Sequence, residues 1–216
     1  RPGDKTICCQ AAGLTLLSRP WLWRKTSPAQ PRPQNRMITF SSLDEACDAV
    51  RAFIRRCADE PRTGRFNELA LGLFAFQFAH NTPYGSLCRE EGRTPETVTD
   101  WRDIPAVPTR AFKSLDLTVL PEAERETVFR SSGTTQTNHS RHYHTRVTLA
   151  LYHASIWRWF SRHLIDDSPN RLLFLLPTLG QALESSLAHM MDAVARRLAK
   201  RDHCFAVDGQ WRIDTQ

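Results

Sequence analysis

The segment best suited to chemistry is rich in hydroxyl side chains and surrounds one glycine. It runs from Ser131 to Asn138 and reads SSGTTQTN in one-letter code. A phosphate group needs many hydrogen-bond donors and close approach of the backbone. Gly133 permits that approach, and the hydroxyls and successive backbone N–H groups supply the donors. The composition is therefore that of a phosphate-binding loop.

A simpler interpretation of the same residues stays open. Ser, Thr, Gly and Asn are all common in turns, so the segment also suits a plain polar hairpin loop. A Walker-type loop is unlikely, because the Gly-Lys-Ser/Thr ending and the earlier glycine are both missing.

Alternating strands and helices are expected to position this loop. Strands at residues 127–130 and 141–145 flank it. The elements that follow are a helix, a fully apolar strand of the kind covered on both faces, a second helix and a third strand, at 147–164, 172–176, 185–200 and 204–207. This alternation is typical of an open α/β sheet.

The region before the loop is expected to be helical and then irregular. Residues 37–92 predict an amphipathic helix over 42–58 with a capping box, a buried helix that Asn67 caps and Pro83 ends, and a short helix over 85–91. Residues 93–125 contain spaced prolines among apolar anchors, which predicts a long irregular connector of the kind that is often functional.

The positive charge of the chain is confined to one end. The 216 residues carry a formal net charge of +6, and all of it lies in residues 1–36; positions 37–216 hold 22 basic and 22 acidic residues. A nucleic-acid or anionic-lipid partner would therefore have to bind this N-terminal arm alone. We expect no nucleic-acid partner and keep a basic-arm interaction protein as a minor alternative.

Residues 1–36 differ in character from the rest. They contain five prolines and precede Met37, the first methionine, after which the amphipathic pattern begins. We interpret Met37 as the natural start and the preceding segment as a disordered or non-native extension. A signal peptide is the rival interpretation, but the small-residue cleavage site is missing. No run reaches the roughly 20 apolar residues of a membrane span.

Cysteine usage predicts a reducing, cytoplasmic environment. The six cysteines include no C-x-x-C pair, and those after Met37 lie far apart, which favours free thiols. His139, His142 and His144 lie close together, but no cysteine or carboxylate at ligand spacing joins them. We therefore expect no protein-built metal cluster.

The loop and a series of motifs around it resemble a known family. Ser-Ser-Gly-Thr-Thr between two strands resembles the phosphate-binding signature of the adenylate-forming superfamily, which includes acyl-CoA synthetases and phenylacetate-CoA ligases. Further motifs, in the same order, look like the LuxE acyl-protein synthetase family; they lie at 66–71, 74–78, 94–98, 104–109, 111–113, 128–135, 140–144 and 185–190. The match covers about residues 65–190, and the linked order makes it far more specific than the loop alone.

The resemblance implies an activity, cofactors and partners. The family joins a carboxylic acid, often a fatty acid, to ATP with Mg²⁺, forms acyl-AMP, and passes the acyl group to a thiol. The acceptor would be a cysteine of a reductase-like partner protein or coenzyme A. The protein's task is to hold the triphosphate, neutralise its charge and exclude water from the mixed anhydride.

The resemblance also implies site residues and a fold. The phosphates would lie on Ser131, Ser132, Gly133, Thr134 and Thr135, with Mg²⁺ near Thr135, and we infer that Arg141 or His142 faces the same anion. Ser185, Ser186 and His189 would line the nucleotide or acyl pocket at the end of a strand. Each has a plain alternative: the serines as a helix cap, and His189 as a core histidine. The implied fold is an open sheet with helices on both faces.

Two departures from the family limit this interpretation. Gln136 stands where most superfamily loops have a second glycine. The family's adenine and ribose contacts, its lid with a catalytic lysine and its acyl-accepting cysteine all lie downstream of the residues present, so we interpret the chain as an N-terminal fragment. The alternative function is a catalytically inactive nucleotide- or acyl-binding module.

Overall fold

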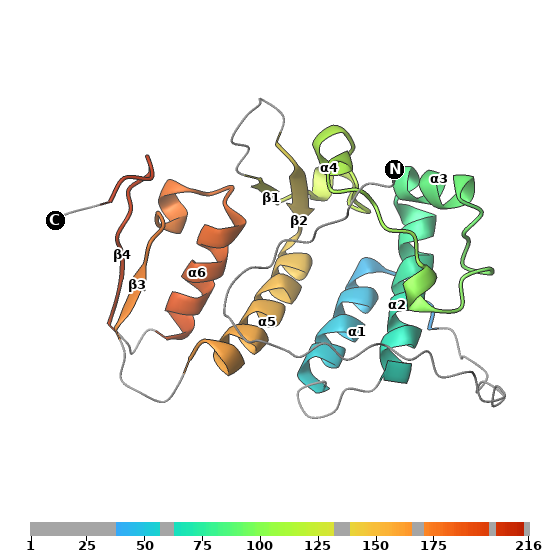
Figure 1. The fold of residues 1–216 in the computed structure, drawn as a ribbon, viewed down its shortest axis with the longest axis horizontal. Coiled ribbons are helices and arrows are strands. Elements are labelled where there is room, and N and C mark those ends of the chain that lie inside the picture. The colour runs from blue at the N-terminus through green and yellow to red at the C-terminus, as the bar shows by residue number, and fades with distance from the viewer. Residues whose placement is uncertain (1–37, 57–62, 132–138, 166–170, 199–201, 214–216) are drawn as a thin grey trace, which may run out of the picture. The chain divides into compact units, whose positions relative to one another are not determined.

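The computed structural model describes residues 38–56, 63–131, 139–165, 171–198 and 202–213. They form a mixed α/β structure with six α-helices and two sheets of two strands each (Figure 1). The helices are α1 (Leu43–Arg56), α2 (Thr63–His80), α3 (Thr82–Glu90), α4 (Ala111–Ser114), α5 (Arg146–His163) and α6 (Ser186–Arg197). The strands are β1 (Thr127–Arg130), β2 (Arg141–His144), β3 (Leu172–Phe174) and β4 (His203–Phe205).

The first helix begins much as its capping pattern predicts. The Ser42 hydroxyl accepts a hydrogen bond from the Glu45 N–H at 3.2 Å, and the Glu45 carboxylate accepts from the backbone and hydroxyl of Ser41 at 2.8 Å each. Ala46 and Cys47 are buried, because α1 packs on α5. The predicted start at residue 42 is therefore correct to within one residue.

The second and third helices begin earlier than the sequence predicts. The α2 helix starts at Thr63, so Asn67 lies inside it and the expected N-cap role is wrong. The α3 helix starts at Thr82, with Asn81 as N-cap and Pro83 in the first turn. Proline is well tolerated there because the first N–H groups of a helix have no intrahelical partner.

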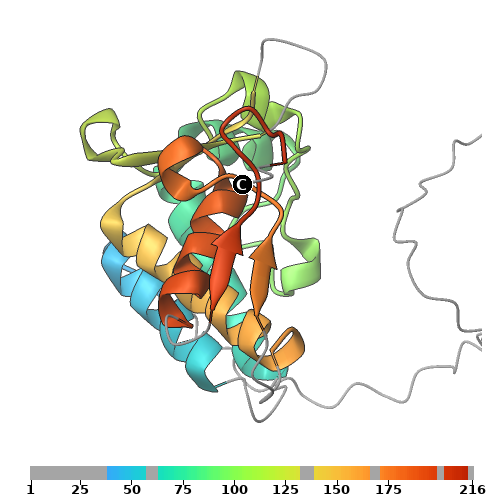
Figure 2. The same ribbon diagram turned by 90° about the vertical axis from the view of Figure 1, so that its left-hand side faces the viewer.

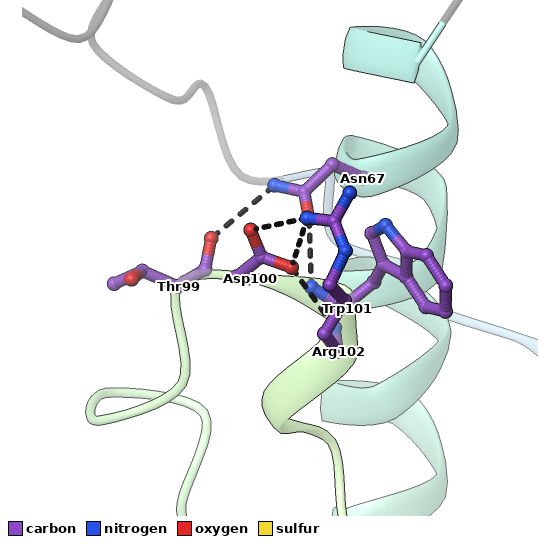
Figure 3. A network of polar contacts seen from close by, with 5 residues as sticks. All are labelled: Asn67, Thr99, Asp100, Trp101 and Arg102. Carbon is purple, nitrogen blue, oxygen red and sulfur yellow. Dashed lines mark hydrogen bonds and ion pairs between the residues drawn. The ribbon is translucent and has the colours of Figure 1, made fainter. Parts of the chain in front are cut away.

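Asn67 instead fastens the irregular connector to α2, as Figure 3 shows. Its amide nitrogen donates to the Thr99 carbonyl at 3.2 Å, and its amide oxygen accepts from the Trp101 N–H at 2.8 Å. Asp100 caps the short 3₁₀ turn Trp101–Asp103 by accepting from the Arg102 N–H at 2.9 Å, and it also pairs with the Arg102 guanidinium. The two hydrogen bonds of the Asn67 amide thus hold residues 99–101 of the connector against α2.

A compact apolar cluster lies between α2, α3 and the connector. Its buried members are Leu71, Phe74, Tyr84, Cys88 and Val98. The Tyr84 hydroxyl donates to the Pro105 carbonyl at 3.0 Å, and burial raises the pKa of this phenol above its ordinary range. The connector is therefore held over the helices by both packing and hydrogen bonds.

Strands β1 and β2 form the predicted antiparallel hairpin. Thr127 pairs with His144 and Arg130 with Arg141. Residues 131–140 therefore connect the two strands at the Arg130–Arg141 end of the hairpin. The α5 helix follows at once, with a capping box in which Thr145 and Thr148 accept hydrogen bonds from each other's backbone. The sequence places these elements within one residue of their observed bounds.

The second sheet is parallel and joins β3 to β4 through the crossover helix α6. Leu172 pairs with His203 and Phe174 with Phe205. Phe174 and Leu176 enter an apolar core with Phe160 and with three α6 residues, Ala188, Val194 and Ala195. Figure 2 shows β3 and β4 in front of the helices that cover the Phe174 side of this sheet.

The sequence predicts that other elements cover both faces of β3, but among the described residues only one face is covered. Leu173 is 60% exposed and Leu175 66% exposed, on the face away from α6. The described strands also form two separate sheets, not one continuous open sheet. The mixed α/β class is correct, and the larger sheet stays a prediction.

The cysteines and helices bear on two further expectations. Cys47 and Cys88 are buried free thiols, whereas Cys204 is free and exposed. Burial raises the pKa of the Cys47 and Cys88 thiols, so both are held in the unreactive protonated form. Among the residues that the structure describes, none of the helices is both long and apolar enough to span a membrane.

The contact between α2 and α3 gives a stability prediction. A β-carbon on Gly85 would lie 2.5 Å from the Phe78 carbonyl oxygen of α2. We expect Gly85→Ala to lower the free energy of unfolding by about 1–3 kcal/mol, because backbone must shift to admit the methyl group. This clash should outweigh the gain of roughly 1 kcal/mol that alanine gives a helix. Urea unfolding followed by circular dichroism measures the change.

Gly180→Ala is the matched control, because a β-carbon there meets nothing within 4 Å. It should change the stability by less than about 0.5 kcal/mol. Equal unfolding midpoints for the two variants would show that α2 and α3 do not pack as described.

Candidate functional site

The hydroxyl-rich loop begins and ends at a neck formed by Ser131 and Ser140. The Ser131 N–H donates to the Ser140 carbonyl at 3.2 Å, and the Ser140 N–H donates to the Ser131 hydroxyl at 3.1 Å. The His139 ring nitrogen Nδ1 lies 2.6 Å from the Ser131 carbonyl oxygen. These contacts extend the hairpin by one residue pair and fix the two ends of the loop.

Most of the loop itself falls in a part of the chain that the structure does not describe. Ser132, Gly133, Thr134 and Thr135 lie within residues 132–138, outside the described ranges, as does Gln136. Their predicted role in phosphate binding therefore stays a prediction.

The N-terminus of α6 lies beside this neck, held there by Arg130 and Glu184. The Arg130 N–H donates to the Glu184 carbonyl at 2.9 Å, and the Arg130 guanidinium pairs with the Glu184 carboxylate at 2.9 Å. The Tyr152 hydroxyl of α5 adds a hydrogen bond to the Ser186 carbonyl at 2.9 Å. The end of β1 and the start of α6 are thus joined, although 54 positions separate Arg130 from Glu184.

Ser185 is the N-cap of α6. Its hydroxyl accepts a hydrogen bond from the Ala188 N–H at 3.2 Å, so the plain capping alternative is correct for this residue. Ser186 is the first residue of the helix. Because the first N–H groups of a helix carry partial positive charge, this end favours an anion.

Two cavities meet at this point and bring several of the predicted residues together. The larger has a volume of about 810 Å³, and Ser131, Ser185 and Ser186 are among the residues that line it. The smaller, of about 480 Å³, is lined by Ser131, His142 and Ser186, with Phe129, His144 and Tyr152 also in its wall. Both volumes lie in the range of small-molecule sites.

Arg141 is placed differently from the other predicted residues. Its guanidinium pairs with Asp116 at 2.9 Å, and it lines neither of the two cavities described above. Asp116 also accepts from Arg125 at 2.9 Å and from the Tyr143 hydroxyl at 3.3 Å. Burial acts to raise the pKa of Asp116, but Arg125, Arg141 and Tyr143 together lower it. The arginine thus fastens the connector to the hairpin.

His142 and His189 have different surroundings. His142 is exposed and stacks on Phe112 of α4 with ring centres 4.8 Å apart, and burial of part of its ring lowers its pKa. His189 lies on α6 with its ring 4.9 Å from Phe129 and 6.4 Å from His153. His189 is therefore partly buried among these rings, and it is not among the residues that line the two cavities.

Three histidines form a cluster in which two contact the Phe129 ring and the third contacts His189. They are His144 of β2, His153 of α5 and His189 of α6. Burial is the main cause that lowers the pKa of each, and the neighbouring histidines lower the pKa values of His144 and His153 further. All three are therefore neutral near pH 7. Among the described residues, neither this cluster nor any other group of three or more His, Cys, Asp or Glu side chains is arranged to hold a metal ion.

Several residues of the site escaped the sequence analysis. Arg130 and Glu184 join the two elements, while Leu183, Leu187 and Trp211 supply an apolar wall to the larger cavity. No local pattern marks Arg130 or Glu184, because their pairing depends on how β1 and α6 meet. Trp211, an isolated large aromatic residue, is the one member of this set that the sequence could have marked as a candidate site residue.

Comparisons with known proteins add no further assignment. A scan against protein-family models, a search of curated proteins and a search of solved structures each return no match to this chain.

The histidine cluster gives a prediction of pH dependence. Because the pKa values are lowered in the folded state, the unfolded chain binds more protons below the ordinary histidine pKa of about 6.5. The stability that the neutral rings allow is fully present above that pH and is lost as the pH falls below it. We expect the urea midpoint to drop between pH 7.5 and 5.5, and a His144→Phe/His153→Phe/His189→Phe variant to lose part of this drop.

Tyr152→Phe is the control for this measurement. It removes a hydrogen bond in the same cluster but no group that titrates in this range, since burial raises the Tyr152 pKa. It should lower the midpoint about equally at both pH values. A histidine variant with the same pH dependence as the unmodified chain would contradict the assignment.

Proposed function

We propose that this protein activates a carboxylic acid with ATP as acyl-AMP and passes the acyl group to a thiol, in the manner of acyl-protein synthetases. The observation that carries the proposal is that Ser131, the first residue of the hydroxyl-rich segment, lies at one cavity with the N-terminus of α6. Ser131, Ser185 and Ser186 line this cavity, although Ser131 lies more than 50 positions before the two other serines in the sequence. The finer fold proposed with this activity is the adenylate-forming type of open sheet.

The chemistry has two steps. A carboxylate oxygen attacks the α-phosphorus of ATP, the bond from that phosphorus to the bridging oxygen breaks, and pyrophosphate leaves. A thiolate then attacks the acyl carbon, the carbon–oxygen bond breaks, and AMP leaves. In both steps negative charge develops on phosphate oxygens. Fixed N–H and O–H donors near those oxygens therefore stabilise the transition state and lower the activation barrier.

The described residues supply donors suited to such an anion. The Ser131 hydroxyl, which accepts from Ser140, keeps its own proton to donate. The α6 N-terminus adds the partial positive charge of its first N–H groups. Mg²⁺ would neutralise the triphosphate; this ion commonly binds through substrate phosphates and few protein ligands, which agrees with a hydroxyl such as Thr135 as its protein contact.

An apolar cavity beside the site supports a fatty acid as the substrate. It has a volume of about 400 Å³ and lies between α1, α2, α5 and the connector. Leu117, Thr118, Tyr143 and His144 line both this cavity and the 480 Å³ cavity. An acyl chain buried there could direct its carboxylate toward the 480 Å³ cavity that Ser131 lines. The acceptor thiol is proposed to belong to a reductase-like partner protein or to coenzyme A, in the cytoplasm.

Pyrophosphate exchange tests this proposal. Labelled pyrophosphate and ATP are incubated with the 216-residue chain and a panel of carboxylic acids. We expect exchange that depends on the acid and that falls at least about tenfold in Thr134→Ala and Thr135→Ala, because each loses a phosphate donor. Ser155→Ala, an exposed serine on α5, is the control and should exchange normally.

The assay separates the two candidate functions. Binding of Mg-ATP without exchange for any acid, in folded protein, would replace the enzyme by a nucleotide- or acyl-binding module. Unchanged exchange in both threonine variants would show that the phosphates of ATP do not bind to this loop.

A further inference from the structure

One face of α5 is basic and apolar at the same time. The helix contains three arginines and no acidic residue. In its C-terminal half, the exposed residues follow the spacing of one helical face; they are Ser155, Arg158, Trp159, Arg162 and His163, and the exposed Leu164 comes directly after the helix. We call Arg158, Trp159, Arg162, His163 and Leu164 the α5 patch.

The two large apolar members of the α5 patch do not contribute to the core. Trp159 and Leu164 are each 59% exposed, whereas Phe160 of the same helix is buried in the core with Phe174. The Trp159 ring contacts the His163 ring, with ring centres 5.0 Å apart. Both apolar side chains therefore keep a large surface in water beside arginines, and a partner that covers this surface would gain free energy.

Two neighbouring helices make this end of the helical layer more basic. Both α1 and α6 contact α5, and Figures 1 and 2 show all three helices running toward the same end. Their last turns add further exposed arginines, which are Arg55 and Arg56 of α1 and Arg196 and Arg197 of α6. The balanced charge of positions 37–216 predicts that an anionic partner binds the N-terminal arm alone, but this average conceals a basic end.

The helix dipole accounts for only part of this arrangement. The partial negative charge at a helix C-terminus favours cations in the last turn, which explains Arg162 and His163. It explains neither the exposed Trp159 nor the exposed Leu164. Four carboxylates that follow α1 and α5 in the sequence lie outside the described residues; they are Asp59, Glu60, Asp166 and Asp167. The mixed composition of the patch, and not the formal charge of this end alone, therefore carries the inference.

This mixed composition favours a lipid surface over other anionic partners. A nucleic-acid base could stack on Trp159, but the aliphatic Leu164 has no role in base stacking or phosphate binding. At a membrane surface, tryptophan and leucine enter the boundary between headgroups and acyl chains, while arginines on the same helix attract anionic lipids. Both kinds of side chain in the patch then have a partner.

We propose that the α5 patch docks this protein on the surface of membranes that contain anionic phospholipids. Trp159 and Leu164 enter the headgroup boundary, and Arg158 and Arg162 face the lipid phosphates. The β1–β2 hairpin and the start of α6 lie at the opposite end of these helices, so the candidate site stays open to the solvent (Figure 1). The inference goes beyond the proposed function and does not depend on it.

Co-sedimentation of the full chain with lipid vesicles tests this proposal. Vesicles of phosphatidylcholine alone are compared with vesicles that contain about one third phosphatidylglycerol, and we expect binding to the second kind that weakens as salt is added. Arg158→Gln/Arg162→Gln should raise the lipid concentration for half-maximal binding by roughly 10- to 30-fold. Trp159→Ala should raise it by roughly 3- to 10-fold, because less apolar area is buried.

Two matched variants control these measurements. Arg24→Gln/Lys25→Gln lowers the net charge by the same amount, but in the N-terminal arm. Trp211→Asn removes a tryptophan outside α5 that is 58% exposed, and asparagine tolerates the positive φ of that residue. Both variants should bind anionic vesicles as the unmodified chain does, and circular dichroism checks that all variants are folded.

Fluorescence locates the tryptophan that enters the lipid. Spin-labelled phospholipids should quench part of the tryptophan emission of the bound chain, and this quenched part should fall sharply in Trp159→Ala but not in Trp211→Asn. Equal quenching in the two variants would show that Trp159 does not enter the membrane.

The other outcomes are equally decisive. Failure of the unmodified, folded chain to bind anionic vesicles overturns the proposal, and so does binding that the arm variant weakens as much as the α5 variant. Binding of single-stranded RNA that depends on Arg158 and Trp159, without binding of vesicles, would replace the membrane by a nucleic-acid partner.

Discussion

The burial of Phe129 is the interaction on which the candidate site depends. This side chain lies on β1, is 4% exposed, and contacts the rings of His144, Tyr152 and His189. These three residues belong to β2, α5 and α6, so one ring joins the hairpin to both helices behind it. The position of the loop neck relative to the α6 N-terminus follows, because Arg130 is the next residue along β1. Arg130 makes a backbone hydrogen bond and an ion pair with Glu184, just before α6.

The connector is held to this assembly by a second, electrostatic contact. Asp116 gathers Arg125, Arg141 and Tyr143 from the connector and from β2, and the Arg125 guanidinium lies 4.3 Å from the centre of the Tyr143 ring. A segment with little regular structure gains order in this way without a core of its own. The carboxylate and two guanidinium groups are partly desolvated, so each would be costly to leave without its partners.

Local patterns in the sequence predicted the elements of this fold and failed on their assembly. The capping residues, prolines and apolar runs placed the hairpin, α5 and α6 correctly, because those signals act within a few residues. Asn67 was misassigned as a cap because its true partners, Thr99 and Trp101, lie more than 30 positions away. The apolar run at 172–176 predicted two covered faces, yet Leu173 and Leu175 are exposed, since the run cannot specify what packs against it.

The candidate site shows the same division between local and distant information. Glycine and hydroxyl residues mark the loop, but the role of Arg141 was inferred from its charge alone. In the structure Arg130 pairs with Glu184, whereas Arg141 shares the single carboxylate of Asp116 with Arg125. Because Arg141 lines neither cavity and Arg130 is paired with Glu184, an anion bound beside Ser131 would meet mainly neutral donors and the α6 N-terminus.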